Sequence, residues 1–199
     1  MKPQNKKKLD KYYLMLNAAG AVFAKLGFHK STISLIAAEA GVADGTIYLY
    51  FKNKEDILYQ FLIYKTTSVF DKMRRAASDP EDAEAKLRSL IRCHLKAFQD
   101  DRDMAVIFHS EVRYLRDLEH QIKNISKIYL DFLTEIIEHG QVQGTMRQDL
   151  FLGLVKRFVL GSVEGVINTW IAAEGKYDLV AMADPLVDLY MNGIRQNVR

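Results

Sequence analysis

The sequence is poor in the residues that mark several protein classes. Its 199 residues include one cysteine, Cys93, which excludes an internal disulfide. Three prolines and the lack of alternating β-branched runs argue against a β-sheet protein. No apolar run reaches the ~18 residues that a membrane span needs. The basic start of the chain, MKPQNKKKLDKYY, has no apolar stretch behind it, so it does not resemble a secretion signal. Together these features predict a cytoplasmic protein with a reduced thiol and no membrane association.

Patterns of catalytic or metal-binding residues are also lacking. The five histidines are scattered, and none belongs to an HExxH or comparable ligand spacing. His109 and Glu111 are two residues apart in a predicted helix, so their side chains face different ways. The chain has no phosphate-binding glycine loop and no nucleophile elbow. The sequence therefore predicts no enzyme, no metal site and no cofactor.

What the chain does have is a hydrophobic content of 49% and an uneven distribution of charge. Residues 1–54 hold nine lysines and three acidic residues, a net charge of +6, while the remainder has a net charge of −3. A positive charge confined to one end suggests that this end binds a polyanion. The alternative is an ordinary solvated lysine surface.

Two short helices joined by a tight turn are predicted within residues 31–54, STISLIAAEAGVADGTIYLYFKNK. Ser31 or Thr32 can cap the first helix, Gly41 can end it, and Asp44 can cap the second. The apolar residues that share helical spacing are Ile33, Ile36, Ala37, Ala40, Ile47 and Phe51. The pattern predicts a helix-turn-helix whose second helix is displayed to solvent and recognises DNA.

The outward face of that second helix carries small residues, hydroxyls and phenols beside two lysines. Thr46 and Lys54 suit contacts with DNA phosphates. Tyr48 and Tyr50 can donate to phosphates or lay a ring against a thymine methyl group. The alternative for the tyrosines is that they only fill the surface.

The rest of the chain also has helical periodicity. Helices are expected over residues 6–26, 54–77, 104–115, 118–139 and 151–173, with two more beginning at Asp79-Pro80 and Asp184-Pro185. The helix over 151–173 and the last helix are more apolar than one buried face requires, which suggests a subunit interface. We therefore predict an all-α protein of about nine helices, with a three-helix DNA-binding domain at 1–53 and an effector-binding and dimerisation domain at 54–199.

The segment GVADGTIYLYFKNKEDIL resembles the recognition segment of the TetR family of transcriptional regulators. Within that family the chain is similar to the acyl-CoA-responsive (FadR-like) repressors of fatty-acid degradation, and NTWIAAEGKYDLVAMADPLVDLYMNGI is a second, weaker point of similarity. The resemblance implies a homodimer whose last two long helices form a four-helix bundle. Two recognition helices suit two DNA half-sites one or more helical turns apart.

The resemblance also implies site residues. Family positions and side-chain chemistry together give the predicted DNA-binding set Thr32, Asp44, Gly45, Thr46, Tyr48, Leu49, Tyr50, Lys52 and Lys54. The predicted walls of a pocket for a long-chain fatty acyl-CoA are Phe98, Met104, Ile107, Phe108, Tyr129, Phe132, Phe158, Val166 and Trp170, and for each of them ordinary core is the stronger alternative. The predicted phosphate ligands of that effector are Arg113, Arg116 and Lys123, for which a solvated charged face is the alternative.

These features predict a DNA-binding transcriptional repressor of fatty-acid metabolism genes that long-chain acyl-CoA releases from its operator. One alternative keeps the DNA binding but replaces the effector with another amphipathic ligand and the target with efflux or catabolic genes. A second alternative is an acyl-CoA-binding carrier with a vestigial helix-turn-helix.

Overall fold

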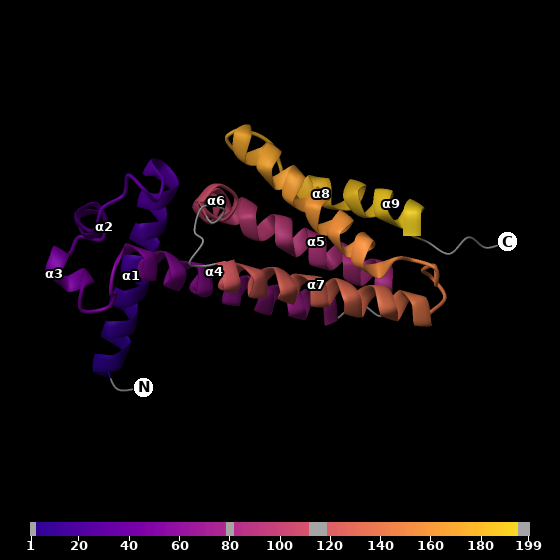
Figure 1. Ribbon diagram of the computed structural model, residues 1–199, viewed down its shortest axis with the longest axis horizontal. Coiled ribbons are helices and arrows are strands. Elements are labelled where there is room, and N and C mark those ends of the chain that lie inside the picture. The colour runs from indigo at the N-terminus through magenta and orange to yellow at the C-terminus, as the bar shows by residue number, and fades with distance from the viewer. Residues whose placement is uncertain (1–2, 79–81, 112–118, 195–199) are drawn as a thin grey trace. The chain divides into compact units, whose positions relative to one another are not determined.

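The computed structural model describes residues 3–78, 82–111 and 119–194, with side chains described except at 3–5 and 110–126. In this part of the chain all regular structure is helical (Figure 1), with nine α-helices, a π-helix and a 3₁₀ turn. The predicted all-α fold is therefore confirmed.

The chain divides into two compact units, Met1–Thr67 with Asp103–Leu118 and Ser68–Arg102 with Glu119–Arg199. Helix α4 (Lys54–Ser78) contributes its first part to one unit and its second part to the other. The domain boundary predicted after residue 53 stays a prediction.

In the first unit, α1 (Pro3–Leu26) packs against α2 (Ile33–Glu39), and α2 packs against α3 (Asp44–Ile47). The buried side chains of this unit include Leu16, Phe23, Ile36, Ile47, Phe51, Ile57 and Phe61. Thr32 is the N-cap of α2, with its hydroxyl accepting from the backbone N–H of Leu35 at 3.2 Å, and Gly41 follows α2 with a φ of 64°. Both features were predicted.

The start of α3 differs from the prediction. Its N-cap is Ala43, without a side-chain hydrogen bond, and Asp44 is the first helical residue. The carboxylate of Asp44 instead accepts a hydrogen bond from the hydroxyl of Ser34 in α2. Asp44 therefore joins the two helices of the motif rather than capping the second.

The second unit is built around α5 (Ala83–Asp100), which packs against α7 (Glu119–Val142), α8 (Leu152–Ala172) and α9 (Ala183–Ile194), as Figure 1 shows. A 3₁₀ turn (Val180–Met182) precedes α9. The buried side chains include Leu90, Ile91, Leu95, Leu133, Ile137, Val163, Ile167 and Val187. On the polar side of this contact, Arg88 and Arg92 of α5 form ion pairs with Asp184 of α9.

Two further expectations need correction. Helix α5 begins at Ala83 with Asp82 as N-cap, whose carboxylate accepts from the N–H of Ala85 at 2.8 Å; Asp79 and Pro80 lie outside the described residues. The helix predicted over 104–115 is divided into α6 (Arg102–Val106) and a π-helix (Ile107–Glu111), and 112–115 are not described. None of the described helices is long and apolar enough to cross a membrane.

Candidate nucleic-acid interface and effector site

The recognition segment presents most, though not all, of its predicted outward residues to solvent. Tyr48 is 59% exposed and Leu49 78% exposed, whereas Ile47 and Phe51 are buried. Backbone hydrogen bonds continue past α3, from the N–H of Tyr50 and of Phe51 to the carbonyl of Ile47, both at 3.0 Å. The segment after α3 therefore keeps a helical course, with the inward side chains of Ile47 and Phe51 four residues apart as the sequence predicts.

Helix α1 supports this segment from behind. The ring of Tyr12 stacks on Phe51 at 5.2 Å between centroids and lies 6.5 Å from Tyr50, which is half-buried. The Tyr12 hydroxyl donates to Oε1 of Gln60 at 3.1 Å, and burial raises the pKa of Tyr12. Lys8 Nζ lies 6.0 Å from the centre of the Tyr50 ring. Tyr50 is therefore held in place, while Tyr48 projects freely.

The remaining residues of the predicted DNA-binding set differ in exposure and in partners. Asp44, Gly45 and Lys52 are exposed, and Thr46 is half-buried. The Thr32 hydroxyl caps α2 as an acceptor, so its proton is available to a phosphate. Lys54 is different, because its ammonium group is directed at backbone carbonyls of the turn after α1.

The predicted effector residues are distributed over both units. Phe98, Tyr129, Phe132 and Trp170 are buried in the second unit, and Val166 is half-buried there. Met104 and Ile107 are buried, and Phe108 half-buried, in the segment 103–111 of the first unit. The predicted phosphate ligands Arg113 and Arg116 lie outside the described residues, as does the side chain of Lys123. The predicted set is thus not brought together within either unit.

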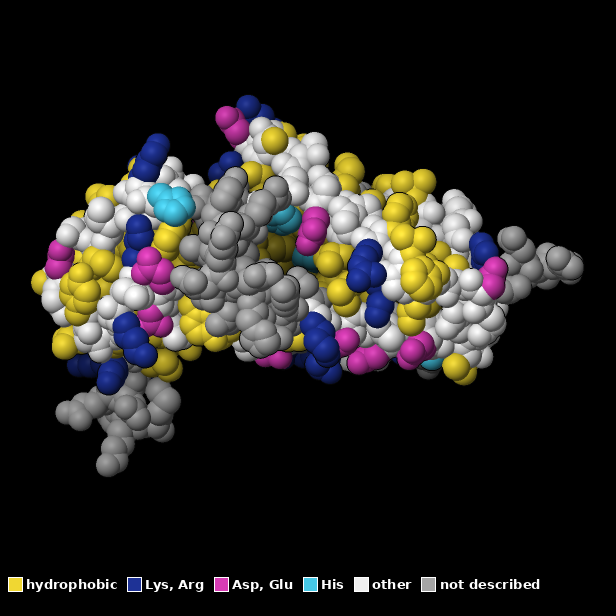
Figure 2. All heavy atoms as spheres, in the orientation of Figure 1, with side chains coloured by type: hydrophobic (Ala, Val, Ile, Leu, Met, Phe, Trp, Pro, Cys, Tyr) yellow, Lys and Arg dark blue, Asp and Glu magenta, His cyan; other side chains and the backbone are white. Residues whose placement is uncertain are grey.

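The predicted wall residue Phe158 lies on the outside of α8. Its side chain is 63% exposed and meets Tyr190 edge-on at 5.8 Å. Leu154, also on α8, and Leu189 on α9 are similarly exposed, and Figure 2 shows hydrophobic side chains gathered over these two helices. Phe158 therefore belongs to an apolar outer face of α8 and α9, which we call the α8–α9 face.

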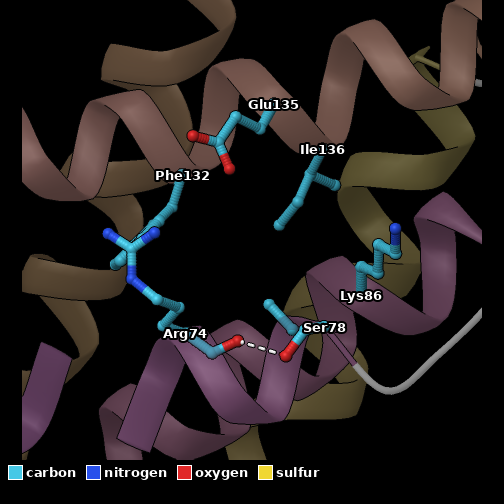
Figure 3. A pocket seen from close by; sticks show the side chains of 7 residues that line it. Arg74, Ser78, Lys86, Phe132, Glu135 and Ile136 are labelled. Atoms are coloured by element: carbon cyan, nitrogen blue, oxygen red, sulfur yellow. Dashed lines mark hydrogen bonds between the residues drawn. The ribbon is translucent and has the colours of Figure 1, made fainter. Parts of the chain in front are cut away.

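A hollow of about 290 Å³ lies in the second unit between α4, α5 and α7 (Figure 3). Its lining residues are Arg74, Ala77, Ser78, Lys86, Phe132, Glu135 and Ile136. Two cations and one acid thus surround an apolar wall that includes the predicted residue Phe132. Sequence reasoning missed Arg74 and Lys86, because on an amphipathic helix they are indistinguishable from solvated charges.

Deeper in this unit the rings of Phe98 and Tyr129 both lie against His94, at 5.2 and 4.9 Å. Within the described residues the Tyr129 hydroxyl is buried without a hydrogen-bond partner. Burial raises the pKa of Tyr129 far above its ordinary value. The Tyr129 hydroxyl is therefore available to a ligand group able to accept a hydrogen bond. The described residues contain no cluster of histidine, cysteine or acidic side chains that could hold a metal ion.

Comparisons with known proteins agree with this architecture. Residues 15–60 match the family model of bacterial regulatory proteins of the tetR family, and residues 63–193 match the C-terminal region of YsiA-like proteins. The chain is 36% identical over 190 residues to the fatty acid metabolism regulator protein of Bacillus subtilis, covering 95% of this chain and 98% of that protein.

Two solved structures of FadR resemble the chain closely. The fatty acid degradation regulator FadR of Bacillus halodurans superposes with a TM-score of 0.88 at 36% identity, over 94% of this chain and 97% of that one. FadR of Bacillus subtilis in complex with stearoyl-CoA has a TM-score of 0.86 at 35% identity, over 92% and 99%. With its helix-turn-helix unit and its helical second unit, the chain belongs to the TetR family of bacterial transcriptional regulators.

Proposed function

We propose that the protein is a repressor of fatty-acid metabolism genes, and that long-chain acyl-CoA releases it from operator DNA. The DNA-binding part of the proposal rests on the exposed neighbouring residues Tyr48 and Leu49. Similarity to FadR, which has been solved with stearoyl-CoA, carries the effector half.

On the DNA side, we propose that Tyr48 and Leu49 enter the major groove with Asp44 and Gly45 beside them. A phenol can donate to a phosphate or contact a thymine methyl group, and leucine can contact the same methyl. Thr32, Thr46, Tyr50 and Lys52 flank this group and have protons to donate to phosphates. Such contacts fix the register of the protein on the duplex, while the groove contacts read its sequence.

On the effector side, we propose that the acyl chain enters the apolar interior of the second unit beside Phe98, Tyr129 and Phe132. The buried Tyr129 hydroxyl would be satisfied by a carbonyl of the effector, such as its thioester. By linkage, an effector that weakens operator binding by a given factor must bind the DNA-free protein more tightly by the same factor.

The proposed working form is a cytoplasmic homodimer joined through the α8–α9 face. Exposed Leu154, Phe158 and Leu189 form an apolar surface, and the burial of such a surface drives association. A two-fold dimer would present two copies of α3 to the two half-sites of an operator. No catalytic step is proposed.

The proposal is tested by fluorescence anisotropy with the DNA upstream of the protein's own gene, with and without a long-chain acyl-CoA. We expect tight binding that weakens with salt and that acyl-CoA abolishes, while free CoA and free fatty acid do not. Tyr48→Ala should lose operator binding and keep acyl-CoA binding. Tyr48→Phe, the matched control, removes only the hydroxyl and should lose less.

Each alternative gives a different outcome. Operator binding that acyl-CoA does not change would still support a repressor, but one whose interior binds another amphipathic ligand. Acyl-CoA binding without specific DNA binding, unchanged in Tyr48→Ala, would instead support an acyl-CoA carrier.

A further inference from the structure

The ammonium group of Lys54 is fully engaged inside the first unit. It donates to the carbonyl oxygens of Phe28 at 2.7 Å, Ser31 at 2.9 Å and His29 at 3.4 Å. It also lies 4.4 Å from the centre of the Phe28 ring. An ammonium group has three N–H donors and no acceptor. Each donor thus has a carbonyl within reach, and a DNA phosphate would have to displace one of them.

The position of Lys54 in its helix supports a role outside that helix. It is the first residue of α4, where the helix dipole disfavours a positive charge. The next two residues, Glu55 and Asp56, have the charge that suits this end. Asn53 caps the helix by accepting from the N–H of Asp56 at 2.8 Å. The start of α4 is therefore stabilised without a lysine. The contacts that favour a lysine at position 54 are those with the turn after α1.

This contact joins the two ends of the helix-turn-helix segment. Ser31 directly precedes Thr32, the N-cap of α2, and Lys54 opens α4, so α2 and α3 lie between them in the chain. The Ser31 end is itself fixed, because its side chain is buried and its hydroxyl donates to the carbonyl of Gly27 at 2.7 Å. A single side chain thus closes the segment 31–54 onto a rigid turn.

We propose that Lys54 is a positioning residue that closes this segment and sets the direction of α3, rather than the phosphate ligand that the sequence predicts. The inference rests on the proposed function only in that α3 must read operator DNA. A helix as short as α3 does not hold its own direction, and is fixed by what joins its flanking segments. Loss of the Lys54 contacts should therefore affect base reading more than attraction to DNA in general.

The test compares Lys54→Met with Lys52→Met in binding operator DNA and non-specific DNA over a series of salt concentrations. Lys52 is the matched control, because it is an exposed lysine two residues away. We expect Lys54→Met to weaken operator binding about 10-fold or more, with non-specific binding and the salt slope unchanged. Lys52→Met should weaken both kinds of binding and reduce the salt slope by about one for each phosphate that the protein no longer neutralises.

Lys54→Arg separates the two roles further. A guanidinium is well suited to a phosphate, but its planar fork does not match three converging carbonyls as a compact ammonium does. We therefore expect Lys54→Arg to bind operator about as weakly as Lys54→Met. Circular dichroism would confirm that each variant is folded at the assay temperature.

A measurement on the unmodified protein covers the case in which the variants do not fold. In NMR of lysine ammonium groups, the Lys54 protons should exchange slowly in the free protein and keep their shift when operator is added. A Lys54 signal that is seen only with operator would overturn the proposal. So would a reduced salt slope in Lys54→Met that Lys54→Arg restores, or an equal loss of operator and non-specific binding. If the unmodified protein has no operator, the proposed function fails while the ammonium measurement in the free protein still tests the Lys54 contacts.

Discussion

The guanidinium of Arg74 in α4 lies 5.0 Å from the centre of the Phe132 ring in α7. Both residues line the hollow of Figure 3, and within the described part of the chain Arg74 has no carboxylate partner. Lys86, at the same hollow, donates to Nδ1 of His139 at 3.2 Å. Cations beside an apolar wall suit the phosphate-bearing part of an amphipathic ligand, although Glu135 opposes an anion there.

Arg74→Gln should therefore weaken acyl-CoA binding about 10-fold, or ~1.4 kcal/mol, and leave operator affinity without effector unchanged. Titration calorimetry with a long-chain acyl-CoA measures the first quantity, and anisotropy the second. The matched control is Arg75→Gln, an exposed neighbour that does not line the hollow. If the unmodified protein, Arg74→Gln and Arg75→Gln bound acyl-CoA equally well, the phosphates would have to bind elsewhere, for example at the basic residues predicted around Arg113.

Tyr129→Phe should stabilise the ligand-free protein. Because its buried hydroxyl has no partner in the described residues, removing that oxygen should raise the free energy of unfolding by about 1 kcal/mol. Tyr190→Phe is the control, since its hydroxyl lies 2.7 Å from Oγ of Ser162 and its loss should lower stability by a similar amount. Urea unfolding measures both, and a less stable Tyr129→Phe would contradict the assignment.

Acid should weaken the junction of α5 and α9. Hydrogen bonds from Arg92, and then from Arg88, hold the pKa of Asp184 below its ordinary value. A carboxylate with a lowered folded-state pKa contributes stability above its unfolded-state pKa, near 4, and this contribution is lost as pH falls through the folded-state value. The melting temperature of Asp184→Asn should therefore fall less between pH 6 and 2.5 than that of the unmodified protein.

The matched control for this acid effect is Asp71→Asn, which changes an exposed carboxylate on α4. The fall in its melting temperature between pH 6 and 2.5, which we call the acid limb, should match that of the unmodified protein. Part of the limb should survive in Asp184→Asn, because a hydrogen bond from Arg147 also lowers the pKa of Asp149. An acid limb in Asp184→Asn that is identical to the original would exclude the Asp184 contribution.

Leu189→Glu should separate the proposed dimer. A charge placed in an apolar interface must be desolvated without a partner, which costs several kcal/mol. Sedimentation velocity should show a monomer, and operator binding should weaken because two linked recognition helices become independent. Leu14→Glu on α1, also an exposed leucine, is the control and should stay dimeric. A dimeric Leu189→Glu would place the interface outside the α8–α9 face.

Sequence predicted best what depends on near neighbours in the chain. The Thr32 cap involves a residue three positions away, and helical spacing separates buried Ile47 from exposed Tyr48. It did not predict contacts whose partners come from other elements. Lys54 contacts carbonyls more than 20 residues earlier, and Asp44 binds a hydroxyl in another helix. Arg74 and Lys86 line one hollow only because α4, α5 and α7 converge, which no periodicity encodes.

The middle of α8 contains Gly161 and Gly165, and no described atom outside the helix comes within 4 Å of a Cβ built at either. Each glycine costs a helix interior about 1 kcal/mol relative to alanine, and no described residue of the subunit fills the space. In the proposed dimer that space admits the partner's backbone. A subunit alone would then have a looser α8 than a paired one, so the order of this helix would depend on protein concentration.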